Sequence, residues 1–412
     1  MQDQKINKIL YIFFSFSLMI GLFFGEDSSG SGGFIVDFNS TWPLVESPLK
    51  YTISGLGDYE IKFPLHYYIA SIIYFLVQDK FLFRFVYCSI ALFIPYLFFL
   101  CLKNKYENID RNNLFIFSLL IFILPSFRSA AIWPNTQITA IIFFLFSLLY
   151  FVKWEKNKSF EKLNSDLLLT IVFMSLTVYT RQLYAMIFLY FVLVFFQKLK
   201  FQTFVLTCFI IALFAIPGLF FIYYYPTILQ ATFDSNIQNS LLVNASIISF
   251  YLIPFYFVLF FKNKSYVQIN ISASLIHILL IFVLVVFLSF LFNYNFRMGG
   301  GFFIKLSILL FDNLYFFFLT SFLGFIFLYF ISRQSLNNSI LSLILLFGFS
   351  AYIIFAKYFE PMFIILLFLV FQTNITNEFL KRKKDILLFH SYFIIYLISA
   401  LINDALGITK SL

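Results

Sequence analysis

The sequence predicts an all-α, polytopic integral membrane protein with about 13 transmembrane helices. Of its 412 residues, 62% are hydrophobic and 11% are charged, which is more apolar surface than a soluble domain can bury. Apolar runs of roughly 16–25 residues recur from end to end, and each is long enough to cross about 30 Å of hydrocarbon as a helix. We expect helices because they satisfy their own backbone hydrogen bonds in lipid.

The predicted spans follow these apolar runs in chain order. They cover residues 9–24, 81–102, 114–127, 136–152, 167–179, 183–196, 204–225, 246–261, 271–292, 314–331, 340–356, 362–372 and 386–402. The first run follows Lys5 and Lys8 and is not followed by a small-residue cleavage site, so we expect an uncleaved span with its N-terminus inside. The chain 1–412 is expected to form a single transmembrane domain with an outer loop over residues 25–80 and no separate soluble domain.

One apolar segment in that loop is too short to cross a membrane. Pro64 to Val77 contains histidine and tyrosines, whose polar tips suit the membrane surface, so it predicts a helix at the outer interface. The alternative is a further span. That threading would place Lys103, Lys105 and Arg111 outside, which conflicts with the positive-inside rule.

The positive charges of this chain are explained by its predicted membrane topology. The net charge is +9, and basic residues gather in the predicted inner segments around Lys153–Lys162 and Lys381–Lys384. We therefore predict no nucleic-acid partner. Cys88, Cys101 and Cys208 all lie within apolar runs and have no metal-ligand spacing, so we predict neither a disulfide framework nor a metal site.

A few cations stand at the edges of spans on the predicted outer side. They are Lys62, Arg84, Arg128, Arg181, Arg297 and Lys357. A charge near hydrocarbon is costly unless it meets water or a partner, and several cations at one level predict an anionic ligand such as a phosphate-bearing lipid. The alternative is that they extend toward ordinary lipid phosphates or pair with outer acids.

Two adjacent acids, Glu26 and Asp27, follow the first span. A carboxylate at this position can serve as a general base that removes a proton from an attacking hydroxyl. The simpler alternative is that both acids only mark the water boundary. Asp37 and Asp58 are further candidates in the same loop. The Ser28–Gly33 stretch lacks the Lys-Ser/Thr ending of a phosphate-binding loop.

Two further features carry weaker signals. His66 is one of three histidines; we expect it to pack at the polar interface, with a hydrogen bond to substrate as the alternative. The glycine-rich segment Arg297–Gly301 lets backbone approach a ligand closely or forms an ordinary turn.

In the order of its motifs, the chain resembles the C-type glycosyltransferase superfamily, in the branch of protein O-mannosyltransferases and bacterial aminoarabinose transferases. The family's acids at the end of the first span correspond to Glu26-Asp27, and its Lys/His-Pro-Pro-Leu motif is similar to the segment Lys62–Tyr68. Arg84 matches an arginine near the start of the next span, and Thr180–Gln182 matches a polar turn. Lys357–Pro361 is similar to an Arg-Tyr-x-x-Pro motif.

Two positions depart from the family pattern. Ile132-Trp-Pro-Asn135 loosely matches a Leu-Pro-Asp motif but has Asn135 in place of the acid, which weakens any metal-binding role taken from the family. Phe63 replaces the first proline of the Pro-Pro pair.

The resemblance implies a membrane glycosyltransferase. It would transfer a sugar from a polyprenyl-phosphate carrier to a glycan, lipid or protein acceptor, at the periplasmic face of a bacterial inner membrane. It implies that Asp27 is the base, with Glu26 as runner-up. The carrier phosphate would lie against Lys62 and Arg84, with the other outer cations and His66 nearby. No cofactor is predicted, and a need for a divalent metal stays open.

Two other function classes remain as alternatives. A lipid or glycan transporter or flippase is expected to show internal duplication and broken helices near the midplane, and the sequence shows no duplication. A non-catalytic protein of envelope assembly would not require the placement of Lys62 and Arg84.

Overall fold

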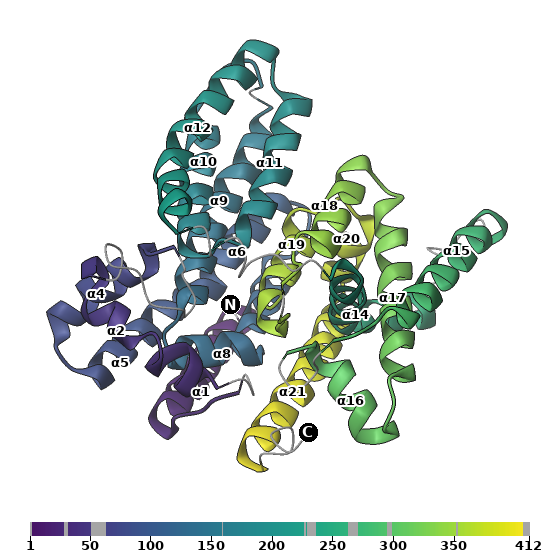
Figure 1. Cartoon of the computed structure of the whole chain (residues 1–412), viewed down its shortest axis with the longest axis horizontal. Coiled ribbons are helices and arrows are strands. Elements are labelled where there is room, and N and C mark those ends of the chain that lie inside the picture. The colour runs from purple at the N-terminus through teal and green to yellow at the C-terminus, as the bar shows by residue number, and fades with distance from the viewer. Residues whose placement is uncertain are drawn as a thin grey trace. The chain divides into compact units, whose positions relative to one another are not determined.

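A computed structural model gives the fold of the chain. It describes residues 2–28, 32–50, 63–158, 160–225, 228, 236–262, 271–294, 299–351 and 353–406. All regular structure within these ranges is helical, so the all-α prediction is confirmed. By its internal contacts the chain divides into two compact units (Figure 1).

The first unit comprises Met1–Thr232 and Leu397–Ala405. Its helices are α1 (Gln2–Phe24), η1 (Gly33–Asn39), α2 (Trp42–Glu46), α4 (Leu65–Val77), α5 (Lys80–Ala91), α6 (Phe93–Lys105), α7 (Arg111–Ser118), η2 (Leu119–Ile123), α8 (Pro125–Ile132), α9 (Thr136–Asn157), α10 (Ser165–Thr180), α11 (Tyr184–Lys198) and α12 (Phe201–Tyr224).

Helices α9 to α12 of this unit lie side by side (Figure 1). Asn157 at the end of α9 bonds Asp166 in the first turn of α10, so these two helices run antiparallel. With 22 residues in α9, its two ends are about 33 Å apart. The Lys198 ammonium from α11 pairs with the Glu155 carboxylate near the C-terminal end of α9. The last turns of α9 and α11 thus bring Lys156 and Lys198 to the same end of the unit, and α9 starts at the opposite end.

A sharp bend precedes α9 and shapes the first unit. Leu124 is extended, as is usual before a proline, and Pro125 then starts α8, where its missing N–H costs nothing. The helical pair Arg111–Ile123 and Pro125–Ile132 consequently bends by 65°. All eight residues of α8 are buried, so this short helix crosses the interior of the unit.

The second unit comprises Phe233–Tyr396 and Leu406–Leu412. Its helices are α14 (Ile237–Lys262), α15 (Ile271–Phe290), α16 (Gly301–Phe311), α17 (Tyr315–Ser332), α18 (Leu336–Phe347), η3 (Ala356–Tyr358), α19 (Met362–Leu369), α20 (Asn374–Lys381) and most of α21 (Lys383–Leu406). Helices α14 and α17 pack closely: a Cβ added at Gly324 would lie 1.9 Å from the Ala245 carbonyl oxygen.

The described helices indicate an integral membrane protein. Seven are long and apolar enough to cross a membrane, or up to nine if each bent pair counts as one span. The second bent pair, Ala356–Leu369 with Asn374–Lys381, turns by 97°. Thirteen spans are not confirmed, because several predicted spans are helices of only 10–17 residues. One segment differs from expectation: Gly301–Phe311 is helical where we expected an outer connection.

Candidate functional site

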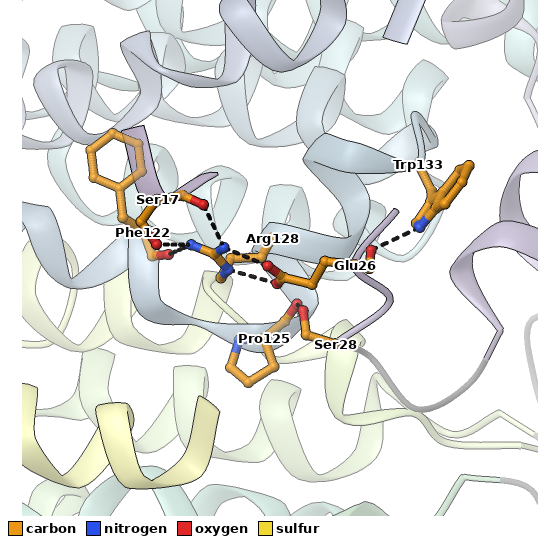
Figure 2. A network of polar contacts seen from close by, with 7 residues as sticks. All are labelled: Ser17, Glu26, Ser28, Phe122, Pro125, Arg128 and Trp133. Carbon is orange, nitrogen blue, oxygen red and sulfur yellow. Dashed lines mark hydrogen bonds and ion pairs between the residues drawn. The ribbon is translucent and has the colours of Figure 1, made fainter. Parts of the chain in front are cut away.

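A network of polar contacts in the first unit joins α1 and the residues that follow it to α8 (Figure 2). The Arg128 guanidinium donates two parallel hydrogen bonds to the Glu26 carboxylate, from Nε at 2.7 Å and from Nη2 at 2.5 Å. Its remaining N–H groups reach the Ser17 hydroxyl, the Ser17 carbonyl and the Phe122 carbonyl at 3.1–3.3 Å. A guanidinium has five N–H donors, so every donor of Arg128 is already used.

This ion pair is buried. The exposed fractions of the Arg128 and Glu26 side chains are 3% and 9%. Gly21 makes room for the pair, because a Cβ there would lie 2.4 Å from Glu26 Oε2. The predicted contact of Arg128 with phosphate would break these bonds, and the Glu26 carboxylate is committed to a cation. The geometry therefore disfavours Arg128 as a phosphate ligand and Glu26 as the base.

Asp27 has a different environment from Glu26. Its carboxylate accepts the Ser129 hydroxyl at 3.0 Å and the backbone N–H of Phe34 at 3.1 Å, and the residue is partly exposed. Gly33 packs against both partners: a Cβ there would lie 2.3 Å from Ser129 Oγ and 2.8 Å from Asp27 Oδ1. The Ser129 hydroxyl and the Phe34 N–H are both neutral donors, and a carboxylate that such donors hold in a partly exposed position suits a proton acceptor.

A second carboxylate lies at the junction of α8 and α9. Asn135 caps α9, since its side-chain oxygen accepts the N–H of Gln137 at 2.8 Å. Its amide nitrogen donates to Asp37 Oδ2 at 3.3 Å. This explains why asparagine suits position 135: an ionised aspartate could cap the helix but could not donate to Asp37.

Trp133 connects the acids to Arg84. Its indole N–H donates to the Glu26 carbonyl at 2.8 Å (Figure 2). Its ring stacks under the Arg84 guanidinium, whose central carbon lies 3.6 Å from the ring centre. Arg84 also donates to the carbonyls of Ile132 at 2.9 Å and Leu22 at 3.5 Å. Among the described residues no carboxylate pairs with Arg84. It therefore keeps N–H donors for an anion.

His66 belongs to a buried hydrogen-bond cluster. Its Nδ1 lies 2.9 Å from the Thr139 hydroxyl and 3.2 Å from the Tyr87 hydroxyl. Tyr87 also donates to the Asn135 carbonyl at 3.0 Å. With 2% of its surface exposed, His66 ties α4 to α5 and α9, which agrees with packing better than with contact to a substrate.

Of the four remaining predicted cations, two lie within the described part of the chain, Arg181 and Lys357. Arg181 follows Thr180, the last residue of α10, and thus lies at the end of the first unit where α9 begins. Phe63 packs nearby on Tyr179, with ring centres 5.6 Å apart. Lys357 belongs to the second unit, where its ammonium lies 4.8 Å from the centre of the Phe355 ring. Lys62 and Arg297 fall outside the described residues, as does Asp58.

Sequence reasoning missed Ser129 and Trp133 as members of this site. Their signal in the sequence is weak: prolines at 125 and 134 flank them and predict breaks on both sides of a short element.

Within the described ranges no group of three or more histidine, cysteine or acidic side chains could hold a metal ion. No protein-family model, curated protein or solved structure matches this chain.

Proposed function

We propose that this protein is a membrane glycosyltransferase that moves a sugar from a polyprenyl-phosphate carrier to an acceptor at the extracytoplasmic face. One observation carries the proposal. Ser129 of α8 donates to the partly exposed carboxylate of Asp27, and Trp133, directly after α8, lies under Arg84, which has no carboxylate partner among the described residues. A base and a phosphate-binding cation are the two groups that this reaction needs. The resemblance of the sequence supplies the reaction type.

The chemistry assigns one task to each group. The acceptor oxygen attacks the anomeric carbon as Asp27 takes its proton. The bond between that carbon and the phosphate oxygen breaks, and the polyprenyl phosphate leaves with both bonding electrons. Negative charge grows on the phosphate in the transition state, where Arg84 stabilises it. Attack from the side opposite the phosphate inverts the anomeric configuration.

The proposal includes an orientation in the membrane. We assign the Asp27 end of the first unit to the periplasm of a bacterial inner membrane and the Lys198–Glu155 end to the cytoplasm, following the positive-inside rule. The thirteen spans and the interfacial position of Leu65–Val77 belong to this proposal. Lys62, which directly precedes Phe63 in the chain, is proposed as a second phosphate contact.

One observation favours the transporter alternative. The described chain has two helix pairs bent by 65° and 97°, and broken helices often line the substrate sites of transporters. Activity in detergent separates the two functions, because transfer needs no sealed membrane and transport does.

The test is release of polyprenyl phosphate by the purified protein in detergent. The donors are polyprenyl-phosphate-linked hexoses and aminoarabinose, each offered with a mixture of glycan, lipid and peptide acceptors. We expect release with at least one pair, and its loss in Asp27→Asn. No release with any pair, together with movement of the same donors across liposomes containing the protein, would support the transporter instead.

A further inference from the structure

Helix η1 exposes three consecutive apolar side chains. The exposed fractions are 42% for Phe34, 68% for Ile35 and 49% for Val36. The same seven-residue element buries Gly33 and Phe38. Leaving apolar side chains of this size in water forgoes about 1.5–3 kcal/mol each relative to full burial. The exposed side of η1 therefore requires an apolar environment.

The buried side of η1 is fixed firmly to the first unit. Phe38 packs on Trp42 and Trp133, with ring centres 5.1 and 5.8 Å apart. The Phe34 ring lies 4.6 Å from Trp133, and the Phe34 N–H donates to Asp27. These contacts define the orientation of η1: Ile35 and Val36 are exposed, and the Phe34 ring packs on Trp133 with part of its surface still exposed. The exposed side chains cannot turn inward without breaking these contacts.

The position of η1 identifies what covers this side. The helix α1, a candidate span, ends at Phe24, whose exposed fraction is 86%, so η1 begins within ten residues of a lipid-facing end. The surrounding side chains are typical of a membrane surface: Trp42 is buried beside η1, and the Lys80 ammonium lies 4.6 Å from the centre of its ring.

We propose that η1 inserts Phe34, Ile35 and Val36 into the outer leaflet of the bilayer. The occupant of this surface is lipid hydrocarbon, which also surrounds the end of α1. Insertion has a consequence for the site, because the N–H of Phe34 is a donor to the Asp27 carboxylate. Lipid contact on the exposed side of η1 thus adds to the protein contacts that hold η1, and with it the Phe34 N–H, against Asp27. The insertion itself follows from a membrane location alone, whereas the effect on Asp27 rests on the proposed function.

Depth measurement with spin labels tests the insertion without any activity. The label is placed at Ile35→Cys in a protein whose three native cysteines are replaced by serine, and the protein is reconstituted in vesicles of phosphatidylethanolamine and phosphatidylglycerol. The matched control is Asn39→Cys, an exposed polar position at the end of the same element.

We expect the label at 35 to collide mainly with oxygen, which concentrates in lipid, and the label at 39 mainly with a water-soluble nickel chelate. Equal access of the nickel chelate to both labels would overturn the insertion. Shielding of the label at 35 from both reagents would also overturn it, because a protein partner or second copy would then cover η1.

The effect on Asp27 has its own test. Ile35→Asp should lower kcat about tenfold or more, which is less than the roughly 10²–10⁴-fold contribution of a positioned base itself, without changing the affinity for the polyprenyl donor. The conservative Ile35→Leu should retain kcat. A wild-type kcat in Ile35→Asp would refute the positioning role while leaving the depth result intact. If the wild-type protein transfers no sugar, the proposed function fails and the spin-label result still decides the insertion.

Discussion

Glu26 and Asp27 are neighbours in the chain, yet they contact different partners. Glu26 accepts two hydrogen bonds from the buried Arg128, while Asp27 accepts one each from Ser129 and Phe34. Both acids follow α1, which ends at Phe24. The ion pair with Arg128 turns Glu26 toward the interior, whereas Asp27 stays partly exposed. The first is suited to stability and the second to chemistry.

This division predicts opposite effects of two conservative substitutions. Glu26→Gln leaves a buried arginine without its carboxylate and should destabilise the protein by about 3–5 kcal/mol. Asp27→Asn keeps the size of the side chain and should leave the unfolding temperature nearly unchanged while lowering turnover by roughly 10²–10⁴-fold. Thermal unfolding and turnover of both purified variants provide the measurement.

A control separates the ion pair from general damage at that position. The double variant Glu26→Gln with Arg128→Gln should lose less stability than the sum of the two single changes, because it leaves no unpaired charge. Stable, fully active Glu26→Gln with inactive Asp27→Asn would show that the ion pair contributes little. Full turnover in both single variants would show that the acids only mark the membrane boundary.

Asn135 allows a second test at the scale of one residue. Asn135→Asp keeps a good cap for α9 but replaces the donor to Asp37 with a carboxylate. Two acids would then meet without a shared donor, and we expect a loss of about 1–3 kcal/mol. Ser335→Asp makes the same kind of change at the N-cap of α18 and should cost less. Equal unfolding temperatures for the two variants would contradict the Asn135–Asp37 contact.

At the scale of elements, the bend at Pro125 creates the site. It turns α8 away from the preceding helix so that Arg128 meets α1 and Ser129 meets Asp27, each across about a hundred residues of sequence. The sequence predicts a break at this proline from local rules. It does not predict which partners the following helix meets, since those depend on the packing of the whole unit.

The close packing of α14 against α17 in the second unit predicts the effect of a substitution at Gly324. Gly324→Ala places a methyl group against the Ala245 carbonyl, a backbone atom that has no other rotamer to adopt. We expect α17 to move and the protein to lose about 1–3 kcal/mol, seen as a lower unfolding temperature. Leu319→Ala removes a side chain that is 53% exposed on the same helix and should cost little. A neutral Gly324→Ala would mean that the two helices are less closely packed.

At the scale of the whole molecule, composition was sufficient to predict an all-helical membrane protein. The number of spans is harder to predict from the sequence, because an apolar run such as 340–356 is only partly helical. Its helix α18 ends at Phe347. Arg84 and Arg128 illustrate the same limit at the site. Both are arginines near span ends, and the sequence treats them alike. Only the fold reveals that one has a buried carboxylate partner and the other lies on Trp133.

The charge distribution predicts the orientation of the first unit. Cysteines introduced at Asn39 and Asn157 lie toward opposite ends, since Asn39 is in η1 beside Asp27 and Asn157 ends α9. In intact cells or inverted vesicles, an impermeant thiol reagent should label position 39 from the periplasmic side and position 157 from the cytoplasmic side. Labelling of both from one side would contradict the assignment.

The most direct measurement of the central claim is native mass spectrometry of the protein with polyprenyl monophosphate. The wild-type protein should retain one molecule of this lipid, and Arg84→Gln should bind it about tenfold or more weakly, the usual cost of losing a charge-assisted hydrogen bond. Arg111→Gln, which removes an exposed arginine at the start of α7, should bind like the wild type. Binding by Arg84→Gln at the wild-type level, or no binding by the wild type, would contradict a phosphate site at Arg84 and with it the proposed function.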